Sequence, residues 1–388
     1  MTGVLAERRT TVIGERGAFA RLPALCADKR VLVVASKGTL HRTRAAEWLP
    51  SSAEVFTEFR PNPTVQQAME AARFRHAWSA DLVVGLGGGS ALDVAKAASL
   101  LPRDADDAMR IINDGLAPED RSALVLVPTT AGTGSEVTQF ATLYQEHRKV
   151  SLDTPCARAD IALIDPALTD SCPQELTWSC AFDTLAHAVE SLWSIRSSQE
   201  SRDHATAALR ALVPVLLEAG LEPSRDERDV LSAAATLAGR AIDITRTTAA
   251  HALSYPLTAR LGIPHGRACV LNLTWLVPMV ENAAPDRISD EREAGALHAA
   301  LSTLHSLFGT APGELGALLY KVMERRLGVP FRQQYSPDAE LIALLVAEGM
   351  SSPRMTGMPV SLERSEVRAA MAGALAGRPP KGARSNRA

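Results

Sequence analysis

The sequence feature that most constrains the fold is an apolar run that leads directly into three glycines and a helical segment. Residues 82–86 are hydrophobic and partly β-branched, which is typical of a strand buried on both faces of a sheet. Residues 87–89 are all glycine, and residues 90–98 favour a helix. Glycines at such a junction let the backbone approach a ligand, and the helix N-terminus offers unpaired N–H groups. The unit therefore predicts a phosphate or pyrophosphate cradle, although the same glycines also suit a plain tight connector.

Further apolar runs alternate with helical segments along the first part of the chain. Residues 30–38 and 124–130 each combine a buried-strand pattern with a turn at the end, and residues 52–59 form a further strand-like segment. Two prolines at 60–64 exclude regular structure there, and Thr64 is placed to cap the next helix. Strands that alternate with helices predict a parallel sheet covered on both faces.

The texture of the sequence changes after about Leu168, where alanine and leucine at helical spacing replace the strand patterns. We therefore predict an α/β domain over residues 1–172 and a helical domain over residues 173–377. The final residues, 378–388, are basic and rich in proline and glycine, and they predict a disordered tail.

Composition and charge exclude several classes of function. A net charge of −3 over 388 residues gives no reason to propose nucleic acid or an anionic membrane as a partner. No apolar run is long enough to span a membrane and no signal peptide is evident, so we expect a cytoplasmic protein. The five cysteines are scattered and form no C-x-x-C pair, which predicts reduced thiols and argues against a disulfide frame or a thiolate zinc site.

Small hydroxyl and glycine residues gather a second time at 128–138, after another strand pattern. In an open α/β sheet, ligands bind outside the carboxyl ends of the strands. Both clusters, 87–90 and 128–138, fall at such ends, so we expect them to line one shared site; a threonine-rich surface loop is the alternative. Asp93 and Lys96, on the helix after the glycines, also fit an ordinary surface pair.

An acid and a histidine four residues apart, Asp183 and His187, share one face of a helix because the α-helix has about 3.6 residues per turn. Two later histidines, His251 and His265, lie in weakly charged segments beside helix breakers, where a buried imidazole needs a partner. One carboxylate and three imidazoles form a site suited to Fe(II) or Zn(II), with an open position for substrate. Taken singly, a solvated helix face or a satisfied core histidine also explains each of them.

In this order the motifs resemble the iron-dependent, or group III, alcohol dehydrogenase family. The resemblance covers nearly the whole chain and is carried by the segments at 60–64, 87–96, 128–138 and 162–166, by Asp183 with His187, and by His251 with His265 and Gly266. It implies the family's fold, in which an α/β dinucleotide-binding domain with a parallel sheet precedes an all-α metal-binding domain, as in dehydroquinate synthase.

By this resemblance the chain is a metal-dependent, NAD(P)-linked oxidoreductase. The implied metal ligands are Asp183, His187, His251 and His265, with Fe(II) as the metal and Zn(II) as the alternative. The implied contacts to the dinucleotide, NAD(H) or NADP(H), are Ser36, Asn62, Gly87, Gly88, Gly89, Ser90, Asp93, Thr129, Thr130, Ser135 and Lys149. The implied reaction is hydride transfer between nicotinamide and a carbonyl or alcohol carbon, with the metal as Lewis acid. The family expectation for assembly is a homodimer.

Two positions depart from the family pattern. Many members carry a second histidine near the substrate, four residues after the ligand that His251 matches, and here that position is Tyr255. Its hydroxyl can donate a proton, so we assign it a catalytic role; packing against Pro256 is the alternative. Many NAD-using members place an aspartate where this chain has Ser36, and serine removes a charge that would repel a 2′-phosphate. Use of NADP(H) is therefore open.

The segments at 190–195, 251–257 and 262–266 are similar to the phosphonoacetaldehyde reductase branch of the family, which reduces that aldehyde to 2-hydroxyethylphosphonate. An anionic substrate needs cations, and the arginines near the implied ligands are Arg196, Arg202, Arg246 and Arg267. The alternatives are a generic short-chain aldehyde or alcohol, a lyase of the dehydroquinate synthase type, and a binding protein without catalysis.

Overall fold

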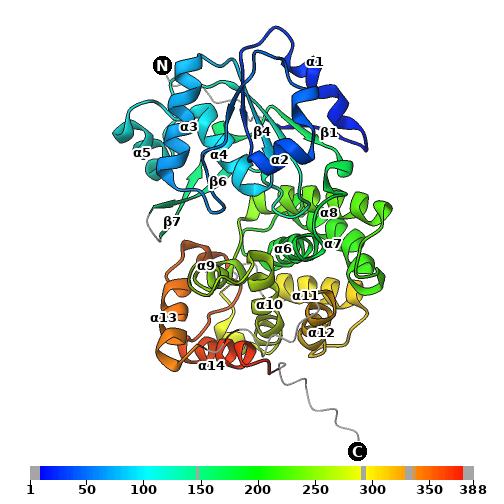
Figure 1. The fold of residues 1–388 in the computed structure, drawn as a ribbon. Coiled ribbons are helices and arrows are strands. Elements are labelled where there is room, and N and C mark those ends of the chain that lie inside the picture. Colours follow the sequence, from blue (N-terminus) through cyan, green and yellow to red (C-terminus); the bar gives the residue numbers. More distant parts are fainter. Residues whose placement is uncertain (1–8, 146–147, 290–293, 328–334, 336, 379–388) are drawn as a thin grey trace, which may run out of the picture. The chain divides into compact units, whose positions relative to one another are not determined.

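The computed structural model describes residues 9–145, 148–289, 294–327, 335 and 337–378. The chain divides into two compact units, Met1–Cys172 and Pro173–Ala388. Figure 1 shows their helices and strands, coloured by position in the sequence. An α/β first unit and a helical second unit confirm the predicted fold class. Apart from Arg378, the predicted basic tail lies outside the described residues.

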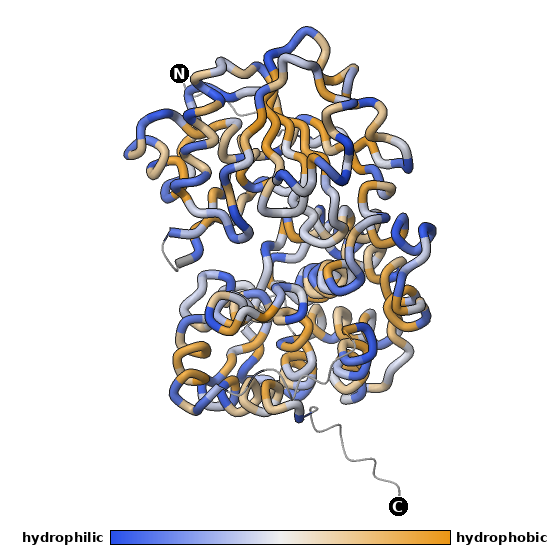
Figure 2. Tube along the Cα trace, viewed as in Figure 1, coloured by the Kyte–Doolittle hydropathy of each residue, from blue (hydrophilic) through white to orange (hydrophobic). Residues whose placement is uncertain are grey.

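The first unit is built on a six-stranded sheet in the order β1-β8-β5-β4-β2-β3, and every neighbouring pair of strands is parallel. The strands are β1 (Thr11–Gly14), β2 (Val31–Val34), β3 (Glu54–Phe56), β4 (Leu82–Gly87), β5 (Ala123–Pro128) and β8 (Ile161–Ile164). Every residue of β2 and β4 is buried, which explains why both are continuous apolar runs without alternation. Figure 2 shows hydrophobic residues concentrated along these strands.

Helices cover both faces of this sheet. They are α1 (Leu22–Cys26), α2 (Lys37–Arg42), α3 (Val65–Trp78), α4 (Gly89–Leu100) and α5 (Ala105–Asp114). Successive side chains of β2 point to opposite faces: Val33 packs with Leu22 of α1 in one core cluster, and Leu32 packs with Leu92 of α4 in another. Thr64 caps α3 as predicted, through a reciprocal capping box with Gln67.

An antiparallel hairpin, which the sequence patterns did not predict, follows the threonine- and glycine-rich segment at 128–138. It pairs β6 (Phe140–Gln145) with β7 (Arg148–Asp153). Lys96 of α4 is fully buried beneath it, and its Nζ donates to the Thr138 hydroxyl at 3.0 Å and the Phe140 carbonyl at 2.7 Å. The interpretation of Asp93 and Lys96 as a surface pair is therefore wrong, because α4 is packed on both sides.

The second unit is a bundle of helices. They are α6 (Gln174–Trp193), α7 (Gln199–Glu218), α8 (Arg225–Thr245), α9 (Ala249–Leu261), α10 (His265–Glu281), α11 (Ala294–Phe308), α12 (Leu315–Leu327), α13 (Ala339–Met350) and α14 (Arg364–Leu375). Helix α6 is buried along nearly its whole length and packs against α7, α8 and α10. Polar side chains on a helix that is buried on all sides must find partners inside the protein. Helix α6 carries three such buried groups, namely Asp183, His187 and Glu190.

Two further features bear on interactions. None of the helices in the described part of the chain combines the length and hydropathy that a membrane span requires.

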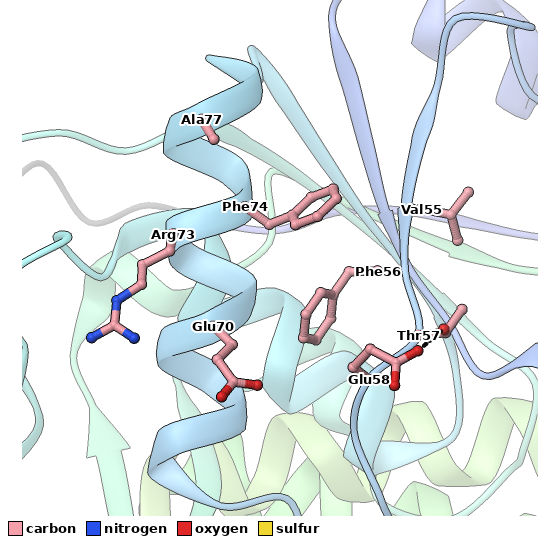
Figure 3. Close-up of a pocket in the computed structure, with 8 residues that line it drawn as sticks. All are labelled: Val55, Phe56, Thr57, Glu58, Glu70, Arg73, Phe74 and Ala77. Atoms are coloured by element: carbon pink, nitrogen blue, oxygen red, sulfur yellow. Dashed lines mark hydrogen bonds between the residues drawn. The ribbon is translucent and has the colours of Figure 1, made fainter.

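A hollow of about 460 Å³ lies between the edge strand β3 and helix α3 in the first unit (Figure 3). Val55 and Phe74 line it and are each more than a third exposed. It contains none of the predicted site residues.

Candidate metal and cofactor sites

The glycine turn lies at the carboxyl end of β4, where Gly87 pairs with Pro128 at the end of β5. Gly87 has φ 153°, and a Cβ there would come within 2.7 Å of the Ala91 Cβ. A Cβ on Gly89 would lie 2.8 Å from the Thr133 side chain. The N-cap residue of α4 is Gly88, so no side chain satisfies the first N–H groups of this helix. A pyrophosphate binds at a helix N-terminus by accepting hydrogen bonds from backbone N–H groups, and glycines leave room for it to approach them.

The structure brings several of the predicted cofactor residues to this edge of the sheet. The Thr129 N–H donates to the Gly87 carbonyl at 2.9 Å, and a Cβ on Gly88 would lie 3.2 Å from the Thr130 hydroxyl. The Asn62 N–H donates to the Ser90 hydroxyl at 3.3 Å. The two clusters therefore lie at the carboxyl ends of neighbouring strands, β4 and β5, and their sharing of one cofactor site stays a prediction.

Ser36, at the end of β2, uses its hydroxyl to cap α2 and accepts from the Thr39 N–H at 3.1 Å. This hydroxyl is also 2.9 Å from the Thr39 hydroxyl. Thr39 in turn lies 3.8 Å from the position of a Cβ on Gly87, so the end of β2 borders the glycine turn. The preference between NADH and NADPH stays open, because a capping serine adds no charge at this edge.

Three further predicted cofactor residues are linked to one another by a hydrogen bond or by charge: Asp93, Ser135 and Lys149. The Ser135 hydroxyl donates to one oxygen of Asp93 at 2.7 Å, and the Thr142 N–H donates to the other at 2.9 Å. Burial raises the pKa of Asp93, and the charges of Lys96 and Lys149 oppose that shift. These contacts tie the loop after β5 and the hairpin to α4, and a direct role of the three residues in cofactor binding stays a prediction.

The predicted metal ligands meet inside the second unit. Asp183 and His187 come from α6, His251 comes from α9, and His265 is the first residue of α10. The Asp183 Oδ1 atom lies 3.2 Å from His251 Nε2, 3.6 Å from His265 Nε2 and 3.7 Å from His187 Nε2. Ligands bound tetrahedrally at about 2.0–2.1 Å from a metal are about 3.4 Å apart, so each imidazole lies at about this spacing from Asp183. The donor atoms of Asp183, His251 and His265 also lie within 4.8 Å of one another, in a group that does not include His187.

The three imidazole rings are packed against one another. His187 and His251 stack with centroids 4.5 Å apart, and His251 meets His265 edge-on at 5.4 Å. The Nδ1 atom of His187 is buried and has no hydrogen-bond partner. Burial lowers the pKa of His187 to about 4, so its imidazole is neutral at pH 7 and able to bind a metal. Burial opposes ionisation of Asp183, but the nearby imidazoles outweigh it and lower the pKa of that carboxyl.

Glu190 belongs to this site, although the sequence patterns did not single it out. It is fully buried one turn beyond His187, and its carboxylate accepts from the Thr248 hydroxyl and the Ala250 N–H, both at 2.7 Å. Its other oxygen accepts a short hydrogen bond from His251 Nδ1. A carboxylate on Nδ1 fixes the ring so that Nε2 faces the metal position.

Tyr255 and Gly266 complete the local geometry around His265. The ring of Tyr255 stacks on that of His265, with centroids 5.8 Å apart and an angle of 3° between the planes. A Cβ on Gly266 would lie 1.8 Å from the Ser179 carbonyl oxygen, so only glycine lets α10 begin against α6.

Comparison with known proteins agrees with this arrangement. Residues 9–166 match the model of the iron-containing alcohol dehydrogenases, and residues 177–308 match that of the C-terminal domain of the Fe-containing alcohol dehydrogenase family. The chain is 33% identical over 337 residues to a phosphonoacetaldehyde reductase of Streptomyces viridochromogenes, which covers 82% of this chain and 84% of the relative. The chain belongs to the iron-containing alcohol dehydrogenase family.

Solved structures of the family share the fold. An iron-containing alcohol dehydrogenase from Thermotoga maritima superposes with a TM-score of 0.78 at 29% identity, covering 95% of this chain and 98% of the other. A sulfoacetaldehyde reductase from Bifidobacterium kashiwanohense, solved in complex with NAD+, superposes with a TM-score of 0.75 at 26% identity, covering 97% and 99%. The chain is therefore an oxidoreductase of the alcohol and aldehyde class.

One cysteine departs from the sequence interpretation. The sequence predicts five thiols without a metal role, and none of the five forms a disulfide. Cys269, however, lies on α10 with its Sγ 3.8 Å from His265 Nε2. Burial raises the pKa of this thiol, but the adjacent His251 and His265 outweigh that effect and lower it to about 7. The spacing of four residues from His265 is the same spacing that pointed to Asp183 and His187.

Removing the metal from this iron-containing alcohol dehydrogenase homologue is expected to lower its melting temperature without unfolding it. A ligand at about a hundredfold above its Kd stabilises the native state by about 2.7 kcal/mol, or about 5–10 °C for a unit of this size. Calorimetry before and after treatment with a chelator measures the shift, and returning the metal should restore it. An unchanged transition in protein shown to have lost its metal would contradict the assignment.

Proposed function

We propose that the protein reduces phosphonoacetaldehyde to 2-hydroxyethylphosphonate, with NADH or NADPH as the hydride donor and Fe(II) or Zn(II) as the bound metal. The observation that carries the reaction type is the convergence of His187, His251 and the partly exposed His265 on one buried oxygen of Asp183. A cytoplasmic location and a homodimer accompany this proposal as predictions.

The roles of the side chains follow from their placement. A metal held by Asp183 and the imidazoles would supply Lewis acidity toward the carbonyl oxygen of the aldehyde. Glu190 keeps the ring of His251 in one orientation and tautomer. The glycine turn and the N-terminus of α4 would hold the pyrophosphate of the dinucleotide. The dinucleotide, when bound, would supply the hydride for the carbonyl carbon, and the Tyr255 hydroxyl is the proposed donor of the proton for the alcohol oxygen.

The proposed substrate is supported by the named relatives. A phosphonoacetaldehyde reductase and a sulfoacetaldehyde reductase are both similar to this chain, and each acts on a short aldehyde with an anionic group. Such a group needs a cation beside the metal, because an uncompensated charge in a buried site is costly.

The four candidate arginines differ in their surroundings. Arg196 donates to the Thr356 hydroxyl at 2.8 Å and Arg202 donates to Gln199 at 3.0 Å, both in exposed contacts. Arg267 is 4% exposed, and burial lowers its pKa. Arg246 is partly exposed, and its guanidinium donates to the Asp243 carbonyl. Its φ of 60° is one that residues other than glycine rarely adopt and that clusters at active sites. We therefore propose Arg246 as the partner of the phosphonate.

Steady-state assays with four aldehydes test this proposal. Phosphonoacetaldehyde, sulfoacetaldehyde, acetaldehyde and propanal are compared with NADH and with NADPH by following cofactor absorbance. The kcat/KM for phosphonoacetaldehyde should exceed that for propanal by at least about 100-fold, and Arg246→Ala should remove most of that preference. Arg202→Ala, in an exposed contact, is the matched control. A rate with propanal equal to that with phosphonoacetaldehyde would refute the phosphonate assignment, and product formation without net oxidation of the cofactor would indicate a lyase.

Replacing Tyr255 with phenylalanine is expected to lower kcat for aldehyde reduction by about 100-fold while leaving the metal content unchanged. The substitution keeps the ring that stacks on His265 and removes only the hydroxyl. The rate and the metal content are measured on the same preparation. A variant as fast as the wild type would show that Tyr255 serves packing only.

A further inference from the structure

A sulfur donor lies at the edge of the imidazole cluster. Cys269 is fully buried on α10, one turn beyond His265. The donor atoms of Asp183, His251, His265 and Cys269 all lie within 4.8 Å of one another. Among the described residues, these four form the group of histidine, cysteine and acidic side chains whose donor atoms are close enough to bind one metal ion.

The position of the sulfur agrees with direct coordination. Zinc binds thiolate at about 2.3 Å and imidazole nitrogen at about 2.0–2.1 Å, so the two donors of a tetrahedral site are about 3.6 Å apart. The Cys269 Sγ lies 3.8 Å from His265 Nε2. Both residues come from successive turns of one helix, so their spacing is fixed by the backbone of α10. The other cysteines in the chain are not part of this group.

We propose that Cys269 supplies a thiolate ligand to the metal and that this sulfur makes the site select zinc over iron. The inference rests on the proposed metal-dependent function, because it concerns the same ion. Thiolate is a soft donor that favours zinc, whereas a set of one carboxylate and imidazoles alone suits either metal. Zinc accepts four or five ligands, so His187 remains compatible with this set.

Substitution with cobalt(II) tests the sulfur directly. The metal is removed with a chelator, cobalt(II) is added, and absorption spectra of the wild type, Cys269→Ser and Cys269→Ala are recorded. The wild type should show near-ultraviolet thiolate-to-cobalt charge-transfer absorption, and both variants should lack it while keeping the visible bands of bound cobalt. Cys180→Ser, on α6 in the same unit, is the control that should keep the charge-transfer band. Bound cobalt without that band in the wild type, or with it in Cys269→Ala, would overturn the proposal.

Selectivity is measured by competition between zinc and iron(II) under anaerobic conditions, with the bound metals determined by elemental analysis. The Zn:Fe ratio should fall more than about tenfold in Cys269→Ala, since even partners one shell beyond the ligands change affinity by about 10–100-fold. An unchanged ratio would refute selection by sulfur. Neither measurement depends on turnover, so loss of aldehyde reduction in the wild type would refute the proposed function without affecting this test. Circular dichroism of each variant confirms that it is folded.

Discussion

Replacing Asp183 with asparagine is expected to abolish stoichiometric metal binding and to lower kcat/KM for aldehyde reduction by at least about 1,000-fold, equivalent to about 4 kcal/mol. One oxygen of this carboxylate is the atom on which three imidazole nitrogens converge. An amide has nearly the same shape but no charge, so it cannot neutralise a divalent ion in a buried site.

Metal content by elemental analysis and rates on the same preparation check this result. Asp203→Asn, the same change at an exposed position on α7, should leave both unchanged. The metal content and rate of Glu190→Gln should lie between those of the two aspartate variants, with metal affinity reduced by about 10–100-fold. The reason is that Glu190 orients His251 without contacting the ion. The assignment of Asp183 as a ligand would be withdrawn if Asp183→Asn kept full metal and full rate.

Replacing Gly266 with alanine is expected to have a comparably large effect through packing alone. The added methyl group would lie 1.8 Å from the Ser179 carbonyl and 2.9 Å from the Asp183 backbone nitrogen, and backbone atoms of a buried helix cannot move aside. The start of α10 must therefore shift away from α6 and carry His265 with it. We expect a loss of about 3 kcal/mol in the free energy of unfolding together with loss of the metal.

Chemical denaturation and metal analysis measure both consequences of this substitution. Gly373→Ala is the matched control, because Gly373 lies in α14 and a Cβ there meets nothing within 4 Å. Alanine favours a helix over glycine by about 1 kcal/mol, so this control should be neutral or slightly stabilising. A Gly266→Ala variant with normal stability and metal content would show that α10 tolerates displacement and that the close approach is unimportant.

The local patterns predicted the fold class well where neighbouring residues decide the outcome. The strand, glycine turn and helix at 82–98 appear as β4 and α4, and Thr64 caps α3 as its spacing indicated. The hairpin of β6 and β7 was missed because it packs on α4 through Lys96. A lysine inside a helix gives no hint that its amine is buried, since that depends on which distant segment covers it.

The candidate site shows the same division between local and distant information. Helical spacing pointed to Asp183 and His187, and it applies equally to His265 with Cys269 and to Glu190 with Asp183, seven residues apart. Cys269 and Glu190 do not stand out in the sequence, because helical spacing alone does not distinguish a metal-site residue from a side chain in the core or on a solvated face. That α6, α9 and α10 bring all these groups to one point depends on packing, which one sequence does not reveal without the family resemblance.

The carboxylate of Glu190 has a consequence for how the centre is assembled. The same group that bonds His251 also accepts from the Thr248 hydroxyl and the Ala250 N–H, where α9 begins. The start of this helix and the orientation of its imidazole are therefore set by one buried anion. A change at Glu190 would accordingly disturb both the first turn of α9 and the ring that faces the metal position.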